Sequence, residues 1–238
     1  GGYSGGTASI NNANAATFVE WMLKLDNLCG HYAATWLGTG VAATIPHTLG
    51  ATPKFIMSKN VTAITDWAAW HSNLTDANYG LVPNTTAAQA SDATLWNGTA
   101  PTSSVMSVGT SAKTNQSGQY VYHFMFAEVP GFSKFGSYTG NANASGPFID
   151  LGFRPRWILI KRIDSTSDWY VYDTARSPFN PVQAQLLLNS TAAETTTLGI
   201  DILSSGFKCR SSTVVNASGG QYIYAAFAEI PFKYARAR

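Results

Sequence analysis

The chain repeats itself at a spacing of about 100 residues, and no other feature restricts its possible folds as much. Residues 49–56 have a counterpart in residues 151–158, where a Leu-Gly step, a proline and an isoleucine recur at matching positions. Because such blocks recur in the same order, the sequence predicts two similar units in tandem. Further matching pairs are Asp66-Trp67 with Asp168-Trp169, residues 84–88 with 189–193, and residues 126–130 with 227–231.

The positions of these blocks divide the chain into three parts. Residues 1–35 form a leader, residues 36–132 a first unit, and residues 138–238 a second unit. The break between the units is expected near residues 131–136, which are rich in glycine. The small differences in spacing between blocks are placed in surface loops, where insertions are tolerated.

Segment 15–28 of the leader has apolar residues at helical spacing, but it also resembles the strand-like stretches 121–126 and 222–227. We therefore predict an extra N-terminal strand rather than a helix. Such a strand could complete the sandwich of a neighbouring unit, because an uncovered sheet edge invites pairing.

Both units carry the local signals of β-strands, which are short segments rich in β-branched and aromatic residues between turn-forming residues. Segment 168–173 has aromatic residues on both faces, which predicts a strand covered from two sides. Units of about 100 residues with such strands predict an all-β fold of two tandem β-sandwiches, jelly-roll or lectin-like. The other predicted strands are residues 55–58, 157–163, 185–188 and 222–228.

Composition excludes several classes of protein. Charged residues make up 12% of the chain and the net charge is +2, which is too small to attract nucleic acid or an anionic membrane. No apolar run approaches the roughly 18 residues of a membrane span, so no membrane insertion is expected. Cys29 and Cys209 lack metal-ligand spacing. We predict free buried thiols, with one long-range disulfide as the alternative, and no metal or cofactor.

No catalytic residue is predicted, and we expect a protein that is not an enzyme. The four histidines lie near no Gly-x-Ser-x-Gly motif, and no spacing marks a pair of catalytic carboxylates among the thirteen acidic residues. A residue that both units keep is interpreted as a requirement of the fold. The structural anchors identified in this way are Trp67 with Trp169, and Glu128 with Glu229, whose carboxylates we expect to be satisfied by backbone donors or an arginine.

A surplus of aromatic residues, 13% of the chain, offers one ligand hypothesis. Most rings are expected in the core, but an exposed ring can pack against a sugar while neighbouring polar groups bind its hydroxyls. The candidates are Trp70 and His71, whose positions in the second unit hold Tyr172 and Asp173, and Trp96 with its neighbour Asn97.

The strings at residues 126–141, 152–157, 173–176 and 222–234 resemble a domain of tailed-bacteriophage virion proteins of the tail-fibre type. The resemblance implies a non-enzymatic virion component outside the cell, a homo-oligomer that contacts other virion proteins and host-surface polysaccharide. Two alternatives stay open. The chain could be a purely structural subunit, such as a capsid decoration protein or an extracellular filament subunit that assembles by strand exchange, or it could be a polysaccharide depolymerase. The oligomer is expected to be a trimer or a filament.

Overall fold

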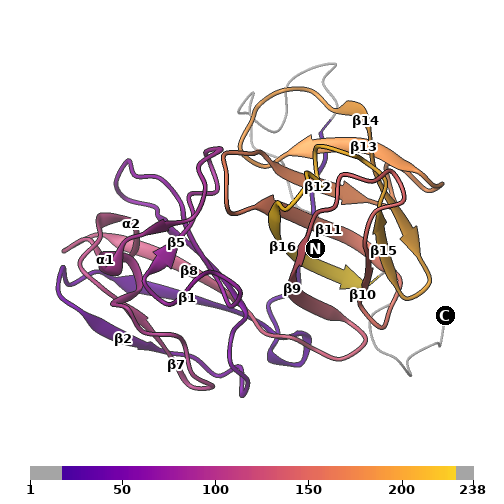
Figure 1. The fold of residues 1–238 in the computed structure, drawn as a ribbon. Helices are drawn as coiled ribbons and strands as arrows, with labels where there is room; N and C mark the ends of the chain where they lie inside the picture. The colour runs from indigo at the N-terminus through magenta and orange to yellow at the C-terminus, as the bar shows by residue number, and fades with distance from the viewer. Residues whose placement is uncertain (1–17, 229–238) are drawn as a thin grey trace.

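The computed structural model describes residues 18–228, and β-strands are its main regular elements (Figure 1). Short helices are η1 (Asn27–Cys29), α1 (Ala93–Trp96) and α2 (Ala112–Asn115). The first half has strands β1 (His31–Leu37), β2 (Ala43–Pro46), β3 (Phe55–Asn60), β4 (Ala68–His71), β5 (Tyr79–Gly80), β6 (Ala90–Ser91), β7 (Val105–Val108) and β8 (Tyr120–Phe126). The second half has strands β9 (Ser133–Thr139), β10 (Phe148–Asp150), β11 (Pro155–Arg162), β12 (Trp169–Asp173), β13 (Val182–Leu187), β14 (Thr195–Leu203), β15 (Gly206–Cys209) and β16 (Gln221–Ala228). The all-β fold predicted from the sequence is confirmed.

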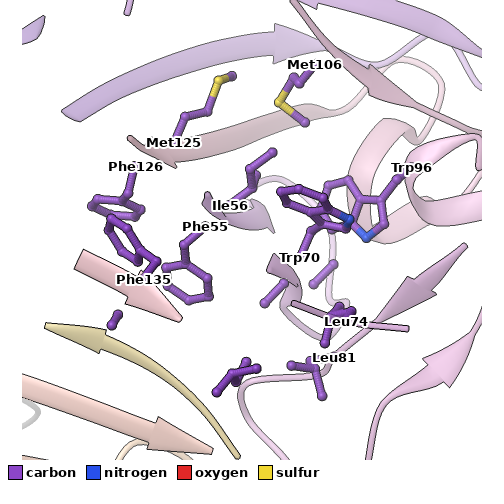
Figure 2. Close-up of a cluster of buried hydrophobic side chains, with 14 of the residues drawn as sticks. Phe55, Ile56, Trp70, Leu74, Leu81, Trp96, Met106, Met125, Phe126 and Phe135 are labelled. Atoms are coloured by element: carbon purple, nitrogen blue, oxygen red, sulfur yellow. The ribbon is translucent and has the colours of Figure 1, made fainter. Parts of the chain in front are cut away.

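The first half is a β-sandwich. Its main layer is a four-stranded sheet in the order β1-β8-β3-β4, and the opposing layer contains the β2–β7 pair. Side chains of β8 alternate in burial, so that Val121 and Met125 face inward, as the two-residue period of a half-covered strand requires. Met106 of β7 and Trp96 of α1 meet Met125 in one core (Figure 2).

The second half is built on an eight-stranded sheet in the order β10-β15-β14-β13-β12-β11-β16-β9. Seven of these strands, all except β9, contribute buried side chains to one core, among them Ile149, Ile160, Tyr172, Ile202 and Tyr222. A flat sheet could not bring β10 and β16, which are six positions apart in the sheet, to a common core. The sheet therefore curls around this cluster, as Figure 1 shows.

The two halves arrange their strands in the same order and register. The order β1-β8-β3-β4 corresponds to β9-β16-β11-β12. Tyr122 of β8 lies opposite Lys59 of β3, and Ile223 of β16 lies opposite Lys161 of β11. The matching sequence blocks therefore fall on corresponding strands. The origin of this correspondence in a tandem repeat stays a prediction from the sequence.

The halves pack directly against each other. Phe126 at the end of β8 lies 6.2 Å from Phe227 of β16, and Phe55 of β3 lies 6.2 Å from Phe135 of β9, measured between ring centroids. Trp169 and other residues on the outer face of β11, β12 and β16 belong to the same apolar cluster as the core of the first half. Segment 168–173 was predicted to be covered on both faces, and β12 is.

The described part of segment 15–28 does not form the expected strand. Residues 18–26 have no regular secondary structure, and residues 1–17 lie outside the described part. The Asp26 side chain accepts a hydrogen bond from the Leu28 N–H and caps η1, which makes a tight bend where a strand was predicted. The segment lies across the second half instead of pairing with a sheet edge.

Both predicted unit boundaries fall inside or beside strands. β1 crosses the boundary predicted between residues 35 and 36, and β9 occupies most of the predicted break. Each strand begins shortly after a glycine with positive φ, Gly30 at 70° and Gly131 at 76°, a conformation that glycine adopts most readily. Neither cysteine forms a disulfide; Cys209 is buried and Cys29 is half-buried.

Candidate functional site

The structure buries the rings that were predicted to bind sugar. Trp70, His71 and Trp96 are 6%, 1% and 2% exposed. Trp70 and Trp96 line one small internal space with Ile56 and Met106, inside the sandwich of the first half (Figure 2). A sugar platform needs an exposed ring face, so the prediction is wrong for these three residues. Asn97 is exposed at the end of α1, in a left-handed conformation with a φ of 53°.

His71 serves the packing of the two halves. Its Nε2 lies 3.2 Å from the Tyr224 carbonyl oxygen in the second half, and its Nδ1 accepts a hydrogen bond from the Asn73 N–H at 3.1 Å. A carbonyl can only accept, so Nε2 must carry the proton. Burial lowers the pKa of His71 to about 4, so the imidazole is neutral at pH 7.

A buried serine–histidine pair lies in the sheet of the first half. Ser58 Oγ is 2.7 Å from His123 Nδ1, and both residues are 0% exposed. Burial lowers the pKa of His123 to about 3. A nucleophile must be within reach of its substrate, and this pair has no exposed surface. The pair therefore stabilises the packing between β3 and β8.

The anchors Trp67 and Trp169 occupy matching hydrogen-bonded corners. The Trp67 N–H donates to Asn84 Oδ1 at 3.0 Å, and the Trp169 N–H donates to Asn189 Oδ1 at 2.8 Å. Each asparagine also donates to the aspartate before the tryptophan, at 2.9 Å in the first half and 2.7 Å in the second. These corners fix the loops that follow β5 and β13.

Glu128 accepts a hydrogen bond from the Phe135 N–H at 3.0 Å, which ties the end of the first half to β9. This is the kind of backbone donor expected for a structural carboxylate. Its partner in the sequence, Glu229, lies outside the described residues. Within residues 18–228 no three His, Cys, Asp or Glu side chains gather closely enough to hold a metal ion. No helix in the same range is long and apolar enough to cross a membrane.

The most unusual surface is a segment that we call the apolar strap, residues 18–28. All of its large apolar side chains are at least 40% exposed, and Met22 and Leu28 reach 82% and 78%. Soluble proteins rarely keep a contiguous apolar surface in water, and such surfaces mark sites of association. The exposed side chains are Phe18, Val19, Trp21, Met22, Leu23, Leu25 and Leu28.

Trp21 attaches the apolar strap to the second half. Its Nε1 donates to Asp173 Oδ2 at 3.2 Å, and its ring meets the edge of Trp157 at 6.3 Å between centroids. The Arg176 guanidinium lies 5.8 Å from the same ring, within range of a cation–π contact. One aromatic side chain is therefore held by an acid, an arginine and a second ring.

Asp173 and Arg176 are themselves fixed by a local network. Arg176 Nε donates to Asp173 Oδ2 at 2.7 Å, and Nη1 donates to Glu194 Oε2 at 2.6 Å. Burial opposes ionisation of Asp173, but hydrogen bonds from Arg176 outweigh it, and the net effect lowers the pKa of Asp173. The docking site of Trp21 is thus charged and ordered.

Two cavities flank the strap. One of about 440 Å³ lies between the strap and β11, β12 and β16, and is lined by Trp157, Phe132 and Phe227 among others. A second cavity of about 720 Å³ lies between the strap and the segments 186–188 and 190–194. The strap therefore lies over the second half without filling the space beneath it.

Comparison with known proteins gives this chain a family. The model of a family described as a domain of unknown function (DUF7483) matches residues 3–231. The chain belongs to the DUF7483 family. No curated protein is similar to this DUF7483 domain. Among solved structures, a crystal structure described as that of the STIV MCP has 9% sequence identity and a TM-score of 0.25. That alignment covers 83% of the DUF7483 domain and 95% of the other chain, and at this TM-score it supports no inference about function.

Proposed function

We propose that this DUF7483 domain is a non-enzymatic structural component of a phage virion and works as a homo-oligomer. The observation that carries the proposal is the apolar strap, whose seven large apolar side chains remain exposed on a single chain. Exposed apolar surface of this kind is stabilised by association. The sequence resemblance to virion proteins of the tail-fibre type supplies the setting, outside the cell and among other virion proteins.

Within that role, a structural subunit is favoured over a sugar-binding adhesin. The candidate sugar platform has no exposed tryptophan ring, because Trp70 and Trp96 are buried. A depolymerase of the two-carboxylate type needs an acid with a raised pKa. Among residues 18–228, the carboxyl groups whose pKa departs from its ordinary value are all shifted downward, namely those of Asp26, Asp164 and Asp173. A tail-fibre, capsid-decoration or filament subunit needs neither feature.

Sedimentation velocity across a hundredfold concentration series tests the proposal. We expect the wild-type chain to associate as its concentration rises. A triple variant, Phe18→Ser with Met22→Ser and Leu25→Ser, should associate more weakly, because it removes exposed apolar area and leaves Trp21 in place. Phe179→Ser is the matched control, since Phe179 is 82% exposed elsewhere in the second half. A wild-type chain that stays monomeric at every concentration would overturn the proposal.

The virion setting has its own test. Antibodies against the purified chain should label particles recovered from the source, and mass spectrometry of those particles should find the chain in several copies. Labelling of cells in the absence of particles would contradict the virion assignment while leaving the oligomer intact.

A further inference from the structure

The outer face of the main sheet is covered in the second half and open in the first. Tyr122 of β8 is 41% exposed, whereas Ile223, which occupies the same register in β16, is 2% exposed. Val61 after β3 is 46% exposed, and its counterpart Ile163 after β11 is 3% exposed. We call this surface of the first half the open face. It comprises Leu37, Met57, Lys59, Val61, Tyr120, Tyr122 and Phe124.

A loop of the first half covers the corresponding face of the second half. The Thr86 carbonyl oxygen accepts hydrogen bonds from the Ser167 N–H at 2.9 Å and from Lys161 Nζ at 3.0 Å. The Gln89 N–H donates to the Ile163 carbonyl oxygen at 3.0 Å. Residues 84–89 thus satisfy backbone groups at the edge of the face and the amine of Lys161, which is 0% exposed.

The second half has a loop of the same design, and among residues 18–228 it covers no sheet face. Its Glu194 pairs with Arg176 at 2.6 Å, and residues 190–194 line the cavity beside the strap. Asn189 begins this loop with the same two hydrogen bonds that Asn84 makes at the start of residues 84–89. By this alignment, Thr191 corresponds to Thr86 and Glu194 to Gln89. Residues 191–194 are all exposed. We call residues 189–194 the free loop.

Lys59 on the open face lacks a second carbonyl acceptor, and the free loop carries such a carbonyl at Thr191. Lys161 Nζ has two acceptors, the Ser167 carbonyl in its own half and the Thr86 carbonyl in the other. Lys59 Nζ donates to the Thr65 carbonyl, which corresponds to the first acceptor. Among residues 18–228, no bond of Lys59 corresponds to the second. The chain thus exposes an open face and a free loop, and the counterparts of these two surfaces already contact each other inside the chain.

We propose that copies of this chain associate head to tail, with the free loop of one copy on the open face of the next. The contact repeats between chains the loop part of the interface that joins the two halves, and the Thr191 carbonyl accepts from Lys59 Nζ. Trp157 and Asp173, the counterparts of Phe55 and His71 in that interface, contact Trp21 of the strap within the same chain. The inference rests on the proposed function, that the chain is a homo-oligomer, and names the surfaces that meet. Because the two surfaces differ, the interface is heterologous, and copies add in one direction.

Two variants, each with one surface blocked, test this arrangement. Thr35→Arg places a bulky cation on the open face beside Tyr122, at a position that is exposed and opposite Tyr122 in the β1–β8 ladder. Ala192→Arg places the same group on the free loop. Each variant alone should lose the association at this interface. Mixed in equal amounts, with Phe18→Ser, Met22→Ser and Leu25→Ser in both chains so that the apolar strap does not contribute, they should form a dimer and nothing larger, because one chain still offers a loop and the other still offers a face.

Tyr122→Asp is a second open-face variant, and Leu198→Arg is the control, because Leu198 is as exposed as Tyr122 but lies outside both surfaces. Thermal unfolding of each variant confirms that it folds. If the wild-type chain associates and both open-face variants associate equally well, the head-to-tail inference fails and the proposed function stands. If the mixture stays monomeric, the contact is not heterologous and the inference also fails. A wild-type chain that never associates would contradict both the head-to-tail inference and the proposed function.

Discussion

At the scale of single residues, two buried asparagines each make several hydrogen bonds that hold loops together. Asn115 Oδ1 accepts from Trp36 Nε1 at 2.9 Å and from the Thr39 N–H at 2.8 Å, and its Nδ2 donates to two carbonyls. Asn216 makes a similar set of bonds in the second half. Composition does not distinguish these two from surface residues, but the repeat does: each begins an Asn-x-Ser-Gly block, at residues 115–118 and 216–219, that the sequence comparison did not use.

Asn115→Ala and Asn216→Ala should each lower the free energy of unfolding by about 2–4 kcal/mol, because each leaves several buried donors and acceptors without partners. Urea unfolding at pH 7 measures the loss. Asn73→Ala is the control, since Asn73 is exposed, and it should change the free energy by less than about 0.5 kcal/mol. Equal effects at all three positions would contradict the structural role assigned to the buried pair.

The two buried histidines predict a loss of stability in acid. The ordinary pKa of histidine is 6.5, and in the folded chain it falls to about 4 for His71 and about 3 for His123. Both groups are neutral when folded, so their contribution is complete above pH 6.5 and is lost as the pH falls toward 4. Each should cost about 2 kcal/mol at pH 5. Urea unfolding at pH 7.5, 6 and 5 measures this slope.

Carboxyl groups also contribute to acid sensitivity, so the histidine part needs a comparison. The double variant His71→Gln with His123→Gln should unfold more easily at pH 7.5, but its stability should change less between pH 7.5 and pH 5 than that of the wild type. Parallel pH profiles for the two proteins would show that these imidazoles do not account for the slope.

At the scale of elements, the apolar strap is held by the Trp21 side chain and by two hydrogen bonds nearer its end. His31 Nδ1 lies 3.0 Å from the Lys24 carbonyl oxygen, and Asn27 Nδ2 donates to Thr48 Oγ1 at 3.0 Å. Trp21 contacts Trp157, Asp173 and Arg176 of the second half, and the side chains on either side of it are exposed. Sequence similarity to β8 and β16 predicted a strand here. The positions beside β8 and β16 are already taken, because β1 pairs with β8 and β9 pairs with β16.

Trp21→Ala should loosen the strap, so that the backbone around the already exposed Lys24 fits more readily into the trypsin active site. We expect cleavage after Lys24 to accelerate at least severalfold, because detachment becomes the local opening step that cleavage follows. Met22→Ala is the matched control, since Met22 is 82% exposed and its loss removes little contact. Cleavage is measured by mass spectrometry over time at low protease concentration. Equal rates for the two variants would mean that Trp21 does not anchor the strap.

At the scale of the whole molecule, the sequence predicted the regular parts well and the irregular parts poorly. Strands β3, β11, β12 and β16 were recognised because β-branched and aromatic side chains alternate between turn residues. Trp70 and Trp96 were misplaced because a ring buried between two layers and a ring exposed at a loop tip have the same local sequence. Their burial depends on contacts with β7 and α1, which no local pattern encodes.

The shared apolar cluster predicts that the two halves unfold together. Phe126, Phe135 and Phe227 lie within 6.4 Å of one another between ring centroids and join the halves. Hydrogen exchange in increasing urea should give β8 and β16 the same opening free energy, in a single cooperative transition. Phe135→Ala should lower both values together, by about 3–5 kcal/mol. Exchange in which β16 opens well before β8 would show that the halves are independent.

The open face of the first half and the covered face of the second also differ in when they are made. Synthesis proceeds from the N-terminus, and domains generally fold in that order. The first half can therefore close its sandwich before β9 leaves the ribosome, and its exposed sheet carries tyrosines and a lysine that tolerate water. The more apolar sheet face, with Leu159, Trp169 and Ile223, is synthesised after the first half. The surface of the first half that covers it is already folded at that time. The order of synthesis therefore shields the sheet face that is most prone to aggregate.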